Sequence, residues 1–429
     1  MVRRSALRLS HLPLAATLCM PGCALPEYEK VDHSPRPNEP VAVATGAQFS
    51  GVVFRAGQVK LWGANESGQL GTGSTSAVGD GPGELGNNLW PVSIHPGFHA
   101  TALAAGGAHV CALSDEYLLK CWGNNSDGQL GIEVSGSRGL APGQMADFLP
   151  FVNLTGGKRP SVVAAGGRHT CARLADGRVK CWGDNEFGQL GLGDTNDRGA
   201  ESGSMGQNLP EVLLGSSAKT VTAGETHSCA LLNSGRVKCW GNNAVGQLGI
   251  GDTENRGDGS GEMGGNLPEV PLDRNAKAVV AGGKHTCAIL DNNSVQCWGY
   301  NQFGQLGVPP ADSNLNRGDQ PGEVLPVVGV GSVKAIAAGY EHTCAILESG
   351  QVQCWGQGQF GQAGNTKGEV QLGGREAVVL ALGPLSNHGC AILDNGAVRC
   401  WGSNDSGQLG LGTTAQRNEV GGEVNVGNP

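Results

Sequence analysis

The residues with the clearest chemical capacity are twelve cysteines that form six pairs, each accompanied by a histidine. In every pair the cysteines are ten positions apart, and the histidine stands two positions before the first cysteine. The pairs are Cys111 with Cys121, Cys171 with Cys181, Cys229 with Cys239, Cys287 with Cys297, Cys344 with Cys354, and Cys390 with Cys400. Cysteine and histidine bind zinc in some proteins, and cysteines form disulfides in exported ones. Three states must therefore be weighed: a metal site, a disulfide, and two buried thiols.

The spacing and one comparison within the chain favour disulfides. Zinc-binding cysteines usually stand closer together in the sequence, and no fourth ligand is evident in the repeated segment. In the first copy Gly51 and Leu61 replace both cysteines together, as expected of a bonded pair. Directly opposed residues on antiparallel strands have Cα atoms about 5 Å apart, within the disulfide range. We predict six disulfides and no metal or other cofactor, with metal binding and free thiols as the alternatives.

The repeated histidines, tryptophans and glutamines are interpreted as structural. A catalytic histidine would be singular, whereas six equivalents occur at His109, His169, His227, His285, His342 and His388. We expect a ring nitrogen of each to bond neighbouring backbone. The tryptophans should fill the space between units, and the glutamine of Gly-Gln-Leu-Gly should satisfy turn backbone. These glutamines are Gln69, Gln129, Gln189, Gln247, Gln305 and Gln408.

The surrounding segments define a unit of about 60 residues. Trp-Gly occurs at Trp62, Trp122, Trp182, Trp240, Trp298, Trp355 and Trp401, at intervals of 57–60 residues and a last interval of 46. Ala175-Asp176-Gly177 separates two short apolar runs, which predicts a three-residue hairpin loop with Gly177 in the left-handed conformation. Residues 162–165 and the run after Pro210 supply two more strands. Seven units of four strands predict an all-β, seven-bladed β-propeller.

The repeated pattern G-x-x-H-x-C-A-L…V-x-C-W-G-x-N-x-x-G-Q-L-G resembles the regulator of chromosome condensation repeat, in the cysteine-containing form of exported bacterial proteins. The resemblance covers about residues 41–429 and implies a seven-bladed propeller. It implies much less about activity, because one fold carries many functions. Guanine-nucleotide exchange on a small GTPase, the activity of the nuclear family member, is one alternative.

The N-terminus is typical of an export signal. Residues 1–23 combine three arginines with a short apolar run, and Gly22-Cys23 stands where a bacterial lipoprotein signal is cut. We predict lipidation of Cys23, with ordinary cleavage nearby as the alternative. Residues 24–40 are interpreted as a proline-rich tether and residues 41–429 as the propeller. We expect residues 41–63 and 419–429 to close the ring by sharing one blade.

Composition limits the partners. The formal net charge is −9, or −12 without the three arginines of residues 1–22, so binding to nucleic acid is disfavoured. Long variable loops at 72–90, 132–149, 192–209, 250–267 and 308–325 should gather on the rim. Trp90 and Phe148 are apolar exceptions in these loops and are the candidate partner contacts.

We therefore predict a non-enzymatic, monomeric protein-binding scaffold, exported to the bacterial envelope or beyond and touching the membrane only through its lipid. A propeller enzyme acting on polysaccharide is the other alternative. It would need a carboxylate or histidine cluster in the central channel that breaks the blade symmetry.

Three further motifs are interpreted as loop structure. Gly-x-Gly-x-x-Gly at 81–86 and at 259–264 neither follows a strand nor opens a helix, so a dinucleotide site is disfavoured. The Arg-Gly-Asp tripeptides at 256–258 and 317–319 lie where other repeats have Arg-Gly alone. In a calcium-like run from Asp194 to Gly199, Arg198 stands where an oxygen ligand would be needed.

Overall fold

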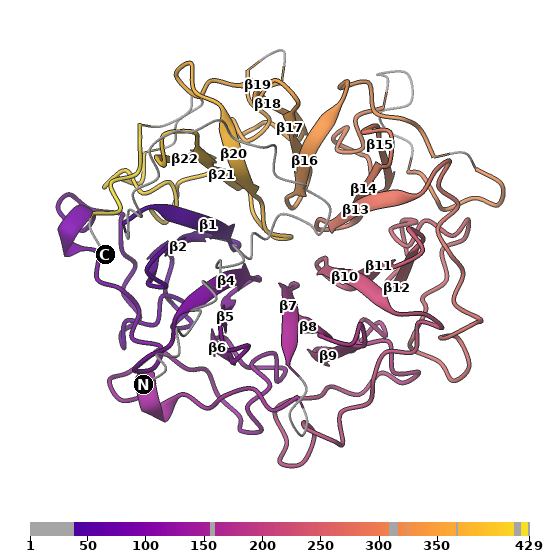
Figure 1. Ribbon diagram of the computed structural model, residues 1–429, viewed down its shortest axis with the longest axis horizontal. Coiled ribbons are helices and arrows are strands. Elements are labelled where there is room, and N and C mark those ends of the chain that lie inside the picture. The colour runs from indigo at the N-terminus through magenta and orange to yellow at the C-terminus, as the bar shows by residue number, and fades with distance from the viewer. Residues whose placement is uncertain are drawn as a thin grey trace, which may run out of the picture.

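Seven antiparallel sheets surround a central channel in the computed structural model (Figure 1), which describes residues 38–154, 159–308, 316–323, 325–365, 368–415 and 422–427. The only helices in these ranges are η1 (Gly86–Asn88) and η2 (Ala146–Phe148), each of three residues. No helix in the described part is long and apolar enough to cross a membrane. The predicted signal with Cys23, and the tether up to residue 37, lie outside the described residues.

Each blade comes from one continuous stretch of chain. Blades 1 to 4 comprise β1 (Pro40–Thr45), β2 (Phe49–Phe54), β3 (Val59–Gly63); β4 (Ala100–Ala105), β5 (His109–Ser114), β6 (Leu119–Gly123); β7 (Pro160–Ala165), β8 (His169–Leu174), β9 (Val179–Gly183); and β10 (Ala218–Ala223), β11 (His227–Leu232), β12 (Val237–Gly241). Blades 5 to 7 comprise β13 (Ala276–Ala281), β14 (His285–Leu290), β15 (Val295–Gly299); β16 (Val333–Ala338), β17 (His342–Leu347), β18 (Val352–Gly356), β19 (Glu369–Val370); and β20 (Ala377–Ala381), β21 (His388–Leu393), β22 (Val398–Gly402). The first strand of each blade lines the channel, and later strands lie farther out (Figure 1). The seven-bladed propeller is confirmed.

The expected fourth strand is wrong for most blades. Among the described residues only blade 6 has a fourth strand, β19, paired with β18. Elsewhere the run after Leu-Pro makes a single backbone bond to the third strand, as in Val212 N–H to the Val179 carbonyl at 2.8 Å, or an isolated bridge, as between Gln296 and Val327. The proline at its start and the irregular connection that follows prevent a regular ladder.

The hairpin of the second and third strands of each blade forms as the turn residues predict. In blade 3, Leu174 donates to the Arg178 carbonyl and Gly177 has φ +87°, so the loop holds three residues with a left-handed glycine. This register sets the two cysteines of each hairpin directly opposite each other, as Cys171 and Cys181 are in blade 3.

All six cysteine pairs are bonded as disulfides within their own hairpins, as predicted. Their Cα atoms are 4.0–4.1 Å apart. The bonds join Cys111 to Cys121, Cys171 to Cys181, Cys229 to Cys239, Cys287 to Cys297, Cys344 to Cys354, and Cys390 to Cys400. In blade 1 Gly51 faces Leu61, whose side chain fills the space. One disulfide therefore links the second and third strands of every blade except the first.

The ring closes between two separate blades, so the shared closing blade is wrong. β1–β3 form a complete sheet of their own, and Val424 donates to Val398 in blade 7. The two ends of the chain still meet at the seam, because Lys60 Nζ in blade 1 donates to the Val426 carbonyl at 2.8 Å. Blade 1, in indigo, lies beside blade 7, in yellow, in Figure 1.

Candidate functional site

The repeated histidines join neighbouring blades instead of forming a catalytic site. His Nε2 meets a hydroxyl of the next blade at 2.8–2.9 Å in five junctions: His109–Thr170, His169–Ser228, His227–Thr286, His285–Thr343 and His388–Ser50. Each hydroxyl donates to a glutamine carbonyl, as Thr170 does to Gln129 at 2.8 Å. The hydroxyl oxygen must therefore accept from His Nε2–H. The expected backbone partner is wrong; the partner is a side chain.

Burial keeps these histidines neutral. It lowers the pKa of His109 to about 4, and it lowers the pKa of the other five repeat histidines to about 3. His342 is the exception in bonding, because Gly389 stands where the next blade would offer a hydroxyl. Neither ring nitrogen of His342 has a partner among the described residues. The junction between blades 6 and 7 therefore lacks this bond.

The tryptophans lie between blades and the glutamine side chains satisfy turn backbone, as predicted. Trp122 Nε1 donates to the Gln69 carbonyl at 3.0 Å, and Trp62 donates to Gln408 across the closing seam. The Gln129 Oε1 accepts from the Asp127 backbone N–H, which satisfies the turn. Gln362 does the same in the sixth repeat, where the altered motif Gly-Gln-Ala-Gly concealed it in the sequence.

A buried lysine beside the second cysteine was missed by sequence reasoning. Lys180 donates to the carbonyls of Gly206 and Leu209 at 2.8 and 2.7 Å, and Lys120 and Lys238 anchor the equivalent loops. Burial lowers the pKa of Lys180. The alternation of Lys120, Lys180 and Lys238 with apolar strand residues was the available signal. These lysines hold the rim loops in place.

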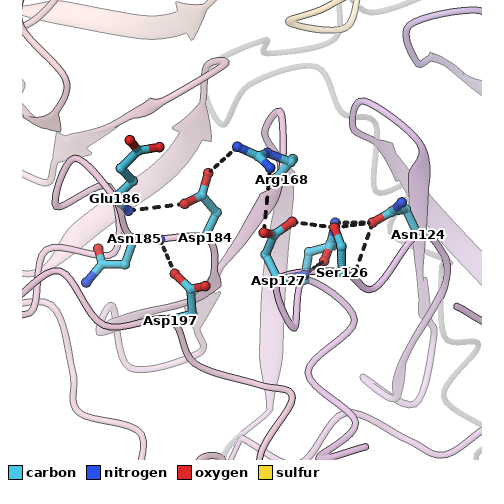
Figure 2. Close-up of polar contacts among 9 residues, drawn as sticks. Asn124, Ser126, Asp127, Arg168, Asp184, Asn185, Glu186 and Asp197 are labelled. Carbon is cyan, nitrogen blue, oxygen red and sulfur yellow. Dashed lines mark hydrogen bonds and ion pairs between the residues drawn. The ribbon is translucent and has the colours of Figure 1, made fainter. Parts of the chain in front are cut away.

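One face of the ring carries the turns that join the first two strands of each blade. On what we call the turn face, the turn between the first two strands bonds the Trp-Gly turn of the same blade, as in Asp184 N–H to Arg168 O at 3.0 Å. Figure 2 shows Arg168 on this face between Asp127 and Asp184. Arg168 Nη1 lies 3.6 Å from Asp127 in blade 2, and Nη2 lies 3.5 Å from Asp184. Arg168 therefore links blades 2 and 3.

The loops that contain the Gly-x-Gly-x-x-Gly and calcium-like motifs are held in place by hydrogen bonds to their own side chains. Glu84 and Glu262, in the Gly-rich segments at 81–86 and 259–264, each accept two backbone N–H bonds. The donors are Gly79 and Gly81 for Glu84, and Gly257 and Gly259 for Glu262. Arg198 donates to Asp194 at 2.8 Å in the calcium-like run. The described residues contain no group of three or more His, Cys, Asp or Glu side chains arranged to hold a metal ion.

The central channel is narrow and uncharged where the structure describes it. Its cavity of about 210 Å³ is lined by inner-strand residues such as Ala104, Val163 and Thr222, and no titratable side chain of the described residues lines it. The non-repeating carboxylates Glu225 and Glu341 lie beyond it, on turns of the turn face. Burial raises the pKa of both, and Lys284 opposes that rise.

The exposed aromatic residues of the described ranges concentrate in blades 1 and 2. Trp90 is 80% exposed and Phe148 is 74% exposed. Tyr117 and Phe151 are exposed too, and four of the five strongly exposed aromatic residues in the described ranges therefore fall between residues 90 and 151. Sequence reasoning missed Tyr117, which has φ +63° where most other blades have glycine. Large exposed apolar side chains concentrated on one edge are typical of a protein-binding surface.

Backbone and side-chain contacts join the segments that carry Trp90, Phe148 and Phe151 into one surface, which we call the aromatic rim. Ala146 in η2 of blade 2 donates to the Ser93 carbonyl of blade 1 at 2.9 Å. His95 of blade 1 lies 2.8 Å from Asp147, and its ring meets that of Phe151 edge-on at 5.3 Å. Two adjacent blades therefore hold Trp90 and Phe148 on one stretch of rim.

Comparison with known proteins places the chain in a family. Two descriptions of the regulator of chromosome condensation (RCC1) repeat match residues 100–129, 161–189, 218–247, 276–305, 333–362 and 386–408, and residues 56–113, 176–231, 234–289 and 292–346. The chain belongs to the RCC1 repeat family. It is 30% identical over 76% of its length to the ultraviolet-B receptor UVR8 of Arabidopsis thaliana, and 27% identical over 76% to the protein Pim1 of Schizosaccharomyces pombe. The alignments cover 66% and 60% of those relatives, so the chain spans about two thirds of their length or less.

Solved structures support the fold alone. Human WBSCR16 matches with a TM-score of 0.68 at 20% identity, over 86% of this chain and 94% of that one. Yeast Prp20, solved bound to Kap60, matches with a TM-score of 0.64 at 18% identity, over 99% of this chain and 90% of that one.

Proposed function

We propose that the protein is a non-enzymatic binding scaffold of the bacterial cell envelope and that it binds a protein partner through its aromatic rim. The observation that carries this proposal is the exposure of Trp90, Phe148 and Phe151 where two adjacent blades meet. Tryptophan and tyrosine dominate the energetics of protein interfaces because they bury a large area with few rotatable bonds. Six disulfides suit an oxidising compartment, which supports export.

The aromatic rim is rigid enough to act as a preformed surface. Lys120 Nζ lies 4.4 Å from the Phe151 ring centroid and donates to the Ala146 carbonyl, so one lysine orders the ring and the loop that carries Phe148. Preformed contacts lower the entropy that binding must lose. The two alternatives have less support. The described lining of the channel offers no catalytic group, and an exchange role rests only on likeness to relatives such as Pim1.

The test compares two substitutions on equivalent parts of the rim. The double variant W90S/F148S should capture its envelope partner more than tenfold more weakly than wild type, because truncating a central aromatic residue costs about 2 kcal/mol or more. L213S is the matched control, since Leu213 is 65% exposed on the rim of blade 3. Affinity capture from envelope extract followed by titration of the captured protein measures both. Equal loss in the control, or turnover of a polysaccharide by the purified protein, would refute the proposal.

The proposed location in the cell envelope and the lipidation of Cys23 are tested separately. Cys23→Ser should abolish incorporation of radiolabelled palmitate and release the protein from the membrane fraction, because the acyl chains would be its anchor. Unchanged fractionation of this variant would argue for ordinary cleavage or for a cytosolic protein.

A further inference from the structure

At five junctions of the ring, the loop of one blade covers the Gly-Gln turn of the blade before it. A Cβ atom on Gly68, Gly128, Gly188, Gly246 or Gly407 would come within 2.3–2.8 Å of the next blade's main chain. The covering segments are the dipeptides Val78-Gly79, Arg138-Gly139, Arg198-Gly199, Arg256-Gly257 and Arg317-Gly318, with the residue that follows each. The glycines of both segments are needed for this approach, because two backbones meet without room for a side chain.

The described residues of blade 6 include no covering segment. Only 46 residues separate Trp355 from Trp401, against 57–60 for the other intervals. The turn of blade 5 that this loop would cover is open: no atom of the described residues lies within 4 Å of a Cβ on Gly304, and Phe303 is 39% exposed. Trp355 is partly exposed, whereas the other six repeat tryptophans are buried.

The missing loop also leaves a strand edge without its usual bridge. In blades 1 to 5 the glycine after each tryptophan exchanges two backbone bonds with the covering segment, as Gly241 does with Arg256 at 2.7 and 3.2 Å. Gly356 makes no such bridge to any described residue. β19 and the Gly368 carbonyl pair with this edge only as far as Cys354. Within the described residues, the N–H and C=O of Gly356 beside the partly exposed Trp355 therefore offer the hydrogen bonds of a strand edge to another chain.

We propose that the open turn at residues 301–307 and the edge of Gly356 form a docking site, the blade 6 gap, for an extended Arg-Gly segment of another protein. At five equivalent turns of the same ring, the covering segment is an extended dipeptide that ends in glycine, and in four of them it is Arg-Gly. These segments show which backbone conformation the blade 6 gap would accept. Glycine is required where the segment crosses Gly304. An arginine would find an opposite charge there, because Glu341 lies on the adjacent turn of blade 6, between β16 and β17.

Aromatic side chains supply the apolar part of the gap. The Tyr300 and Phe303 rings meet edge-on with centroids 6.3 Å apart. Tyr300 is partly exposed and Phe303 is exposed. An arginine laid across such rings gains a cation–π contact. The blade 6 gap depends on the proposed function only in needing a polypeptide partner, and it uses a different part of the ring from the aromatic rim.

The chain supplies its own probe. A blocked peptide of residues 252–263, DTENRGDGSGEM, copies the loop that covers the turn of blade 3. Titrated into the full-length mature protein by calorimetry, it should bind saturably and slow amide hydrogen exchange at residues 301–307 and 355–358. The same peptide with Gly257→Val should not bind, because the added side chain meets the turn backbone.

Two variants of the protein place the binding. F303D should weaken the peptide at least tenfold, whereas F187D, the same turn position in blade 3 where the seat is filled, should leave affinity unchanged, as should W90S. This last result separates the gap from the aromatic rim. Equal weakening by F303D and F187D, or no saturable binding by wild type, would overturn the proposal. So would self-association of wild type that F303D abolishes, since a second copy would then occupy the gap.

Discussion

The two junctions on either side of blade 6 differ at one hydroxyl. Between blades 5 and 6, His285 donates to Thr343, and Trp355 donates to the Gln305 carbonyl at 2.9 Å. Between blades 6 and 7, Gly389 replaces the hydroxyl, and the Trp401 ring lies 2.8 Å from where a Cβ of Gly389 would be. Trp401 then reaches its carbonyl only at 3.3 Å.

That difference shows how the ring is built. The histidine, the hydroxyl and the tryptophan of neighbouring blades form one contact set, so loss of one member changes the other two. The junction between blades 1 and 2 solves the problem differently, since Phe49 takes the histidine position and Val110 takes the hydroxyl position. A junction is complete with two polar partners, a histidine and a hydroxyl, or with two apolar partners, Phe49 and Val110. The pair of His342 and Gly389 is neither.

The largest expected effect is a loss of stability in acid, which all six junction histidines should share. Their pKa is about 3 to 4 when folded, against 6.5 when unfolded. Stability is therefore complete above pH 6.5 and falls as the pH drops toward 4, because only the unfolded chain takes up protons. The slope is about 1.4 kcal/mol per pH unit for each histidine. Thermal midpoints between pH 7.5 and 4.5 measure it, and a flat profile would show that the histidines ionise in the fold.

The next effect comes from the disulfides beside these junctions. Replacing Cys287 and Cys297 by alanine should lower the free energy of unfolding by about 2–3 kcal/mol, as expected for a loop of this length. Replacing them by Gly and Leu, the pair at Gly51 and Leu61 in blade 1, should cost less because leucine refills the space. Denaturant midpoints under oxidising conditions compare the two. A smaller loss for the alanine pair would contradict the packing argument.

A smaller effect addresses the comparison most directly. H285F should lose about 1–2 kcal/mol, because a satisfied buried hydrogen bond disappears. H342F should be neutral or stabilising, because it removes two unpartnered ring nitrogens and copies the packing of Phe49. The same midpoints, with one fewer proton taken up in acid by H342F, provide the check. Equal losses would mean that His342 has a partner.

The smallest effect concerns the turn face. R168A should change the free energy of unfolding by less than about 1 kcal/mol, because the Arg168 side chain is 56% exposed and its ion pairs to Asp127 and Asp184, at 3.6 and 3.5 Å, are screened by salt. Its thermal midpoint should shift by no more than that of an exposed control such as R236A. A large loss would show that the ion pairs, rather than the buried contacts, join blades 2 and 3.

Much of the fold was predictable from the sequence because the chain repeats its own information. Seven Trp-Gly segments at near-constant spacing fix the number of blades, and Asp176-Gly177 between two apolar runs fixes a hairpin register that opposes Cys171 and Cys181. Joint absence of both cysteines at Gly51 and Leu61 was a further signal. Trp90 and Phe148 could be named as exposed because they interrupt a polar loop.

Contacts between blades were beyond the sequence, because residues about 60 positions apart meet only once the ring has closed. The hydroxyl partners of the histidines, the separate blades at the seam and the addition of Phe151 to the aromatic rim all depend on contacts between blades. So does the blade 6 gap: a short interval in the sequence shows that a loop is missing, but only packing shows which turn it leaves uncovered. The sequence by itself determined the unit and its local hydrogen bonds, and the tertiary structure decided what each unit touches.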